Sequence, residues 1–204
     1  MNRDMKYNSP AVVLFIVTLL ALGGFCPELL RADTVADSVD DWSSTGEQGA
    51  NGWSYGYYNL TEDGNNSYSA DEFIEFEAAH WRGEGWRLTP SNCPWTYIAQ
   101  EGVHPNGTNS CPGEEHWPIR RWTSDIAGAV EVTWHTREVN LAGAGVSGLL
   151  FHNGELVDSE VIAGGDGGGV TRTVDLILAA GDVLDLANSP VGPNSNRNDG
   201  SDGS

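Results

Sequence analysis

The chain has 204 residues, enough for one domain of ordinary size. It contains 10 basic and 29 acidic residues, for a formal net charge of −19. So acidic a surface repels phosphate backbones, and the composition therefore argues against nucleic-acid binding. It predicts a solvated surface that keeps the protein soluble or attracts cations.

The first 32 residues have the composition of a secretory signal peptide. Arg3 and Lys6 precede an apolar run over residues 11–22, which favours a helix, and the small residue Ala32 follows. The run is shorter than the ~20 apolar residues of a membrane span. We expect residues 1–32 to be removed after Ala32 on export. The mature protein would then be secreted or held at the cell surface, with no membrane span.

Cys93 and Cys111 are the cysteines that remain beyond this leader. An even number of cysteines in an exported chain favours a disulfide. It would close a loop of about 18 residues and contribute on the order of 3 kcal/mol. A zinc site with His104 and His116 is the alternative, but the closely spaced ligand pairs of zinc signatures are missing. We expect a Cys93–Cys111 disulfide and no metal site.

Aromatic residues mark the strands expected in the first part of the remaining chain. Residues 51–52 are an Asn-Gly turn, and the aromatic run 53–58 after it favours a strand. Gly56 within that run indicates either a bulge or a close approach by another group. Residues 35–42 and 73–77 are also expected to contain strands.

A tryptophan-rich stretch, residues 80–122, follows. It contains five of the eight tryptophans, Trp81, Trp86, Trp95, Trp117 and Trp122. Prolines at positions 90, 94, 105, 112 and 118 predict mostly loop with short extended pieces, because neither a helix nor a long central strand tolerates them.

From residue 126 onwards the pattern is that of regular strands. Strands are expected at residues 129–136, 145–151, 156–162, 170–178 and 183–186, with a hairpin turn at Asn153-Gly154. Many short strands separated by Gly and Pro predict an all-β sandwich or barrel over residues 33–190. Residues 191–204 are polar and are expected to be a disordered tail. The oxygen-rich residues 194–204 leave a structural calcium ion open, although they lack the twelve-residue loop with its closing Glu. No other cofactor is expected.

Several short motifs together resemble a known domain. They are Gln48-Gly49-x-x-Gly52-Trp53-x-Tyr55-Gly56-Tyr57-Tyr58, Pro94-Trp95, Gly102-x-His104-Pro105, Arg120-Arg121-Trp122 and Asn153-Gly154. Over nearly all of residues 35–200 the chain resembles an uncharacterised jelly-roll-like domain of secreted and surface proteins of environmental bacteria. The resemblance implies an exported antiparallel β-sandwich of jelly-roll type, similar to carbohydrate-binding modules, with no catalytic residue. The segment between the two cysteines departs from the family pattern, which also continues past residues 198–199 into one more strand.

Aromatic rings beside Arg and His donors suit a sugar, because a ring stacks on a pyranose while the donors bind its hydroxyls. The candidate ligand-binding residues are Trp86, Trp95, His104, Trp117 and Arg121. The competing interpretation is that these rings are core residues or anchors under a long loop.

Three functions remain open. The first is a secreted, non-catalytic module that binds an extracellular or cell-surface glycan. The second is a structural or adhesive surface module without a small ligand. The third is a glycoside hydrolase or lyase using Glu75 and Glu77, which are about 7 Å apart on one face if the segment is a strand. A solvated strand face is the favoured explanation of these two carboxylates, and no other catalytic motif is present.

Overall fold

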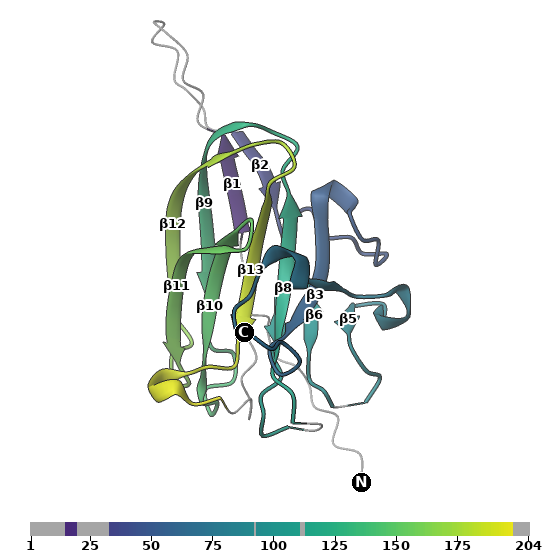
Figure 1. The fold of residues 1–204 in the computed structure, drawn as a ribbon, viewed down its shortest axis with the longest axis vertical. Coiled ribbons are helices and arrows are strands. Elements are labelled where there is room, and N and C mark those ends of the chain that lie inside the picture. Colours follow the sequence, from purple (N-terminus) through teal and green to yellow (C-terminus); the bar gives the residue numbers. More distant parts are fainter. Residues whose placement is uncertain (1–14, 20–32, 92, 111–112, 198–204) are drawn as a thin grey trace, which may run out of the picture.

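The computed structural model describes residues 15–19, 33–91, 93–110 and 113–197 (Figure 1). These residues form thirteen strands, all paired antiparallel, and four single-turn 3-10 helices, η1 to η4, at Ala50–Gly52, Ala70–Glu72, Ala78–His80 and Pro193–Ser195. The all-β, antiparallel fold class expected from the sequence is confirmed.

The strands form three sheets. Sheet A has the order β12 (Val170–Leu178), β9 (Gly128–Thr136), β1 (Phe15–Leu19), β2 (Asp33–Asp37). Sheet B has the order β11 (Glu155–Ala163), β10 (Gly145–His152), β13 (Val183–Ser189), β8 (His116–Thr123), β3 (Trp53–Asn59), β4 (Ile74–Glu75). Sheet C is small and has the order β5 (Gly85–Arg87), β6 (Tyr97–Ala99), β7 (Val103–His104).

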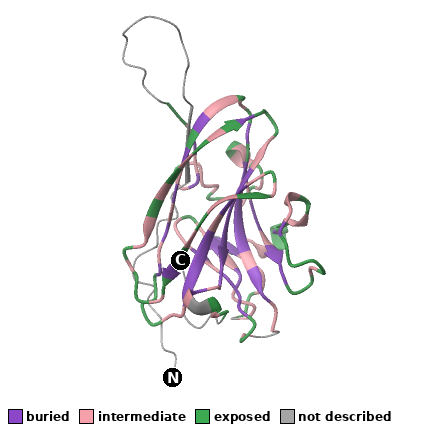
Figure 2. Cartoon of the chain, turned by 60° about the vertical axis from the view of Figure 1, so that its left-hand side comes forward, coloured by how far each residue is buried: buried purple, intermediate pink, exposed green. Residues whose placement is uncertain are grey.

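One apolar core joins the three sheets. Sheet A contributes Val130, Val132 and Trp134, which are completely buried on one face of β9, as the alternation in the sequence predicted. Sheet B contributes residues of β3, β8, β10 and β13, and sheet C contributes residues from each of its three strands. Figure 2 shows the buried residues concentrated along the central strands, with exposed residues at the loops and edges.

A second, smaller apolar cluster covers the opposite face of sheet B. It contains Tyr58, Leu60, Tyr68, Ile119, Phe151 and Ala187. The segment that follows β3 supplies Leu60 and Tyr68, which pack over the sheet. Side chains on both faces of β8 are consequently buried.

Local turn chemistry sets the β10–β11 hairpin. Asn153 has φ 51° and Gly154 has φ 84°, so both central residues of the two-residue turn are left-handed, as this turn type requires. The Asn153 side chain accepts a hydrogen bond from the Val183 backbone N–H at 2.9 Å. The hairpin predicted from the sequence is confirmed.

The close approach expected at Gly56 is also confirmed. Gly56 pairs with Glu75 of β4, and a Cβ added to it would lie 2.3 Å from the carbonyl oxygen of Ile74. Strand β4 therefore requires glycine at this position. It has only two residues, which is shorter than the strand expected over residues 73–77.

The apolar run near the N-terminus differs from its prediction. Residues 15–19, expected to lie in a helix, form strand β1, which pairs with both β2 and β9. Short apolar runs favour a helix and a buried strand alike, and the β-branched residues of this one suit a strand. The remainder of the expected leader lies outside the described residues, so its cleavage stays a prediction. No helix in the described part of the chain has the length and apolar character to cross a membrane.

The end of the tryptophan-rich stretch was wrongly expected to be loop. Residues 116–123 form β8, a central strand of sheet B, even though it contains Pro118. The ladder between β8 and β13 ends at Ile119, so Pro118 has a partner only on the β3 side, where it lies opposite Tyr57. A proline inside the strand is tolerated because only one neighbouring strand meets it.

Contacts with the sheets continue past residue 190. The Val191 carbonyl accepts a hydrogen bond from Ser147 Oγ at 2.5 Å, and Gly192 pairs with Asn196. Arg197 Nη1 lies 2.6 Å from the buried Glu115 carboxylate. The segment 191–197, expected to belong to a disordered tail, therefore packs against sheet B and the loop before β8, and residues 198–204 lie outside the described part.

Candidate functional site

Strand β6 separates a buried face of sheet C from an outward one. Ile98 is completely buried in the core, and Thr96, just before the strand, is buried too and contacts His116 Nδ1 through its hydroxyl at 2.8 Å. Trp95 and Tyr97 alternate with these residues and are only half-buried. Because strand side chains point to opposite faces in turn, the two rings share the outward face.

Strand β5 places an arginine beside this face. Arg87 pairs with Tyr97, and its guanidinium carbon lies 4.6 Å from the centre of the Tyr97 ring. A Cβ on Gly85 would lie 2.8 Å from Tyr97 Cε2 and 2.5 Å from the Ile98 carbonyl oxygen. Glycine at position 85 therefore lets the tyrosine ring lie against the strand, where it supports the Arg87 guanidinium.

Strand β7 adds a histidine. His104 lies opposite Tyr97, and its ring centre is 5.7 Å from that of Trp95, at an interplanar angle of 33°. Its Nδ1 atom lies 2.6 Å from the Pro105 carbonyl oxygen, which fixes the imidazole orientation. Arg87, Trp95, Tyr97 and His104 thus form one polar and aromatic surface, called the sheet C face below.

A hollow of about 250 Å³ opens beside this face. It is lined by Arg82, Glu84, Gly85, Arg87, Pro90 and Tyr97. Arg82, Glu84 and Pro90 are exposed, and Glu84 adds a hydrogen-bond acceptor to the two arginines.

The two arginines of the hollow differ from most others in the described chain. Arg121, Arg172 and Arg197 each form ion pairs with carboxylates. Within the described residues, neither Arg82 nor Arg87 has a carboxylate within ion-pair distance. In so acidic a chain, two such guanidinium groups in one hollow provide a local site for an anion.

No family model, curated protein or solved structure matches this chain. Its function therefore rests on the geometry and chemistry of the site.

Two of the five candidate ligand-binding residues, Trp95 and His104, lie together on the sheet C face. Trp86 lies directly behind it, only 1% exposed, with its ring stacked on Phe76 at 6.1 Å and on Tyr55 at 6.3 Å. In this position Trp86 belongs to the core that supports sheet C.

Trp117 and Arg121 lie on the outer face of sheet B, away from sheet C. Trp117 packs edge-on against Tyr58 and donates from Nε1 to Glu115 at 2.8 Å. Arg121 forms a two-point ion pair with Asp185, at 2.7 and 2.8 Å. Both side chains make structural contacts and do not adjoin Trp95.

Arg82, Arg87 and Tyr97 were not singled out from the sequence. A signal for Tyr97 was present, because it follows Trp95 by two residues and must share its face of a strand. The two arginines gave no such signal, since their convergence on one hollow depends on how β5 and β6 pair.

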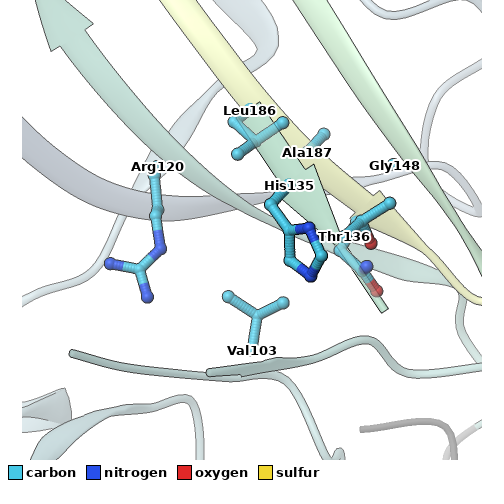
Figure 3. A pocket seen from close by; sticks show the side chains of 8 residues that line it. Val103, Arg120, His135, Thr136, Gly148, Leu186 and Ala187 are labelled. Atoms are coloured by element: carbon cyan, nitrogen blue, oxygen red, sulfur yellow. The ribbon is translucent and has the colours of Figure 1, made fainter. Parts of the chain in front are cut away.

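A cavity between sheets A and B is too small to be a ligand site. Its volume is about 10 Å³, and its lining includes Val103, Arg120, His135, Thr136, Gly148, Leu186 and Ala187 (Figure 3). This is roughly the space of a single water molecule, which excludes an organic ligand.

Arg120 beside this cavity is a completely buried cation. Its guanidinium donates to the carbonyl oxygens of Ala99, of Gln100 at 3.0 Å and of Ser38 at 3.5 Å. Its carbon lies 5.5 Å from the centre of the Trp42 ring. Burial lowers the pKa of Arg120 from 12.5 to about 10, so the group remains charged at neutral pH.

The other sequence predictions concern metals, cysteines and carboxylates. The described residues contain no group of three or more His, Cys, Asp or Glu that could hold a metal ion. Cys111 lies outside the described residues, so its disulfide with Cys93 stays a prediction. Glu75 and Glu77 are both exposed at the edge of sheet B.

Proposed function

We propose that this protein is an exported, non-catalytic module that binds an extracellular or cell-surface glycan, and that the sheet C face and its hollow form the binding surface. The half-buried Trp95 ring offers a surface for a pyranose, while His104 and Glu84 offer hydrogen-bonding groups for hydroxyls. The jelly-roll type of sandwich expected from the sequence is part of this proposal.

The observation that carries the proposal is a pair of arginines beside an aromatic surface, neither of which has a carboxylate partner among the described residues. Bidentate guanidinium groups suit a carboxylate or sulfate substituent, so the preferred ligand is an anionic sugar. The hollow is smaller than the ~300–1,000 Å³ of sites for drug-sized ligands. It suits one sugar ring of a longer chain, with the next ring against Trp95.

The test is a glycan array with uronate-containing, sulfated and neutral oligosaccharides, followed by calorimetry. Arg87→Gln should weaken binding of the anionic ligand roughly 10- to 150-fold, because a hydrogen bond to a charged group contributes about 1.5–3 kcal/mol. Trp95→Ala should weaken neutral and anionic ligands alike. Arg172→Gln, at a partly exposed ion pair between β12 of sheet A and β11 of sheet B, is the matched control and should not change affinity.

The array distinguishes a carboxylate ligand from a sulfated one. A folded protein that binds no glycan above background would overturn the proposal. An affinity for anionic glycans that Arg87→Gln leaves unchanged would place the site elsewhere.

Exposed apolar side chains favour a second candidate, a structural or adhesive surface module. Leu156 and Val161 on the edge strand β11 are 55% and 51% exposed, and Ile177 on the edge strand β12 is 79% exposed. Apolar edge strands are sites of association between chains. Sedimentation of the protein over a range of concentrations tests this function: self-association that Ile177→Thr weakens would support it, and a monomer at all concentrations would refute it.

A further inference from the structure

Strand β1 is the only link between β2 and the rest of sheet A in the described residues. β1 pairs antiparallel with β9 from Phe15↔Trp134 to Leu19↔Val130. On its other edge it pairs with β2 between Ile16↔Asp37 and Leu19↔Asp33. β2 is the last strand of the sheet and has no other strand partner there.

The leader predicted from the sequence includes this linking strand. Cleavage after Ala32 would give a chain that begins at Asp33, the first residue of β2. The same cleavage would remove Phe15–Leu19 from the middle of sheet A. It would leave an open slot, one strand wide, between the hydrogen-bonding edges of β9 and β2.

Contacts beyond β2 oppose closure of this slot by β2 itself. The turn after β2 is held by Gln100 Nε2, which donates to the Val39 carbonyl at 2.9 Å, and by the contact of Arg120 with the Ser38 carbonyl. Trp42 packs edge-on against Tyr55, with 4.6 Å between ring centres. To pair with β9, β2 would have to move by about 4.8 Å, the spacing of one strand, against these anchors.

We propose that the slot between β2 and β9 in the exported protein accepts an extended apolar strand from a second polypeptide. This proposal rests on the proposed export but not on glycan binding. The strand flanking the slot carries Val130, Val132 and Trp134, all completely buried, and Ala36 of β2 is 2% exposed. Every second side chain of the incoming strand therefore faces an apolar core and must be apolar.

Two backbone edges determine the rest of the recognition. β9 and β2 each present a row of N–H and C=O groups to the slot, which an antiparallel strand satisfies on both sides, as β1 does. The partner strand thus has a defined chemistry, namely about five residues with alternating apolar, preferably β-branched, side chains.

The experiment begins with the full chain, exported from a bacterial host by its own leader and weighed by mass spectrometry to establish that it starts at Asp33. Hydrogen exchange of the β2 and β9 amides that face the slot is then measured for the protein alone and with a synthetic peptide, FIVTL between two lysine pairs. The control peptide, FPVPL in the same flanks, lacks two of the backbone N–H groups that a ladder needs.

Without peptide we expect fast exchange at the slot-facing amides of β2 and β9, whereas the β9 amides bonded to β12 stay protected. FIVTL should slow exchange at the slot-facing amides at least tenfold, and FPVPL should not slow it. If the processed protein is unfolded alone, FIVTL should restore the circular dichroism of a folded β protein. Protection that rises with protein concentration would support the proposal and identify a second copy as the donor. A secreted chain that retains residues 1–32, slow exchange at the slot-facing amides of both strands in the isolated monomer, or no effect of FIVTL would each overturn it.

Discussion

The ion pair between Arg121 and Asp185 allows a sharp test of how sheet B is held together. Asp185 is completely buried, and both of its carboxylate oxygens accept from Arg121. The Tyr68 hydroxyl also donates to the carboxylate, at 2.7 Å. The substitution Asp185→Asn keeps the shape of the side chain but removes its charge and one acceptor oxygen.

The cost of this substitution follows from the burial of the guanidinium left behind. Removing one partner of a buried pair costs about 3–5 kcal/mol, because the other charge stays dehydrated without compensation. The Arg121 side chain is 15% exposed, so water reaches part of it and the lower end of that range applies. We expect a loss of about 3 kcal/mol, or a Tm lower by roughly 6–12 °C for a domain of this size.

Urea unfolding followed by tryptophan fluorescence measures this loss. The matched control is Glu160→Gln, which removes the carboxylate that pairs with Arg172. In this pair the Arg172 side chain is 39% exposed and the Glu160 side chain 32%. An exposed pair contributes only about 0–1 kcal/mol. If the free energy of unfolding of Asp185→Asn lies within about 1 kcal/mol of that of Glu160→Gln, the buried ion pair does not contribute as argued. Glycan affinity of the folded variant should be unchanged, because Arg121 lies away from sheet C.

Three further predictions concern other parts of the core and site. Burial lowers the pKa of His116 from 6.5 to about 4. As the pH falls, the unfolded chain therefore takes up a proton at this histidine before the folded chain does. The free energy of unfolding should fall by about 3 kcal/mol between pH 6.5 and pH 4. His116→Gln should remove this loss of stability, as measured by urea unfolding at each pH. If NMR instead gives a titration midpoint above 6.5 for the His116 ring, the Glu114 carboxylate, 3.2 Å away, outweighs the effect of burial. Gly85→Ala should cost about 1–3 kcal/mol through overpacking and weaken ligand binding, while Gly64→Ala, with no atom within 4 Å of its added Cβ, should do neither. Trp86→Ala should lower the free energy of unfolding in urea by about 3–5 kcal/mol and leave the ligand affinity of the folded fraction unchanged. Unchanged stability with lost binding would instead show that Trp86 contacts the ligand.

The regular half of the fold could be predicted from the sequence. In Val170–Leu178 the apolar residues Val174, Leu176 and Leu178 stand at every second position, and the observed strand has the predicted bounds. The Asn153-Gly154 turn fixes the neighbouring hairpin, because few other dipeptides adopt two left-handed conformations in succession. In both cases the signal is local, so it is visible without knowledge of the partner strands.

The features that depended on distant partners could not be predicted in this way. Residues 15–19 become a strand only because β2 and β9 present edges on either side of them. Pro118 is compatible with a central strand only because the ladder between β8 and β13 stops at Ile119 and does not reach Pro118.

The candidate site shows the same division between local and distant information. The residue composition of the tryptophan-rich stretch indicated an aromatic surface with basic neighbours. Which rings face outward was decided by the pairing of β5, β6 and β7, which turned Trp86 inward and left Trp95 half-buried. Arg82 and Arg87 have no carboxylate partner in the described part of the chain, and this depends on the placement of every nearby carboxylate, which no local pattern encodes.

The buried Arg120 has a consequence for how the protein unfolds. Its hydrogen-bond acceptors come from the turn after β2 and from the end of β6. The guanidinium charge can therefore be buried at low cost only when both segments are docked on β8. In an intermediate with sheet C detached, the Arg120 cation would be dehydrated but would lack its hydrogen-bond acceptors. Such a state would therefore be high in free energy. Sheet C should therefore unfold together with sheets A and B in a single cooperative transition. A ligand held on sheet C would then raise the melting temperature of the entire molecule, by mass action on that one transition.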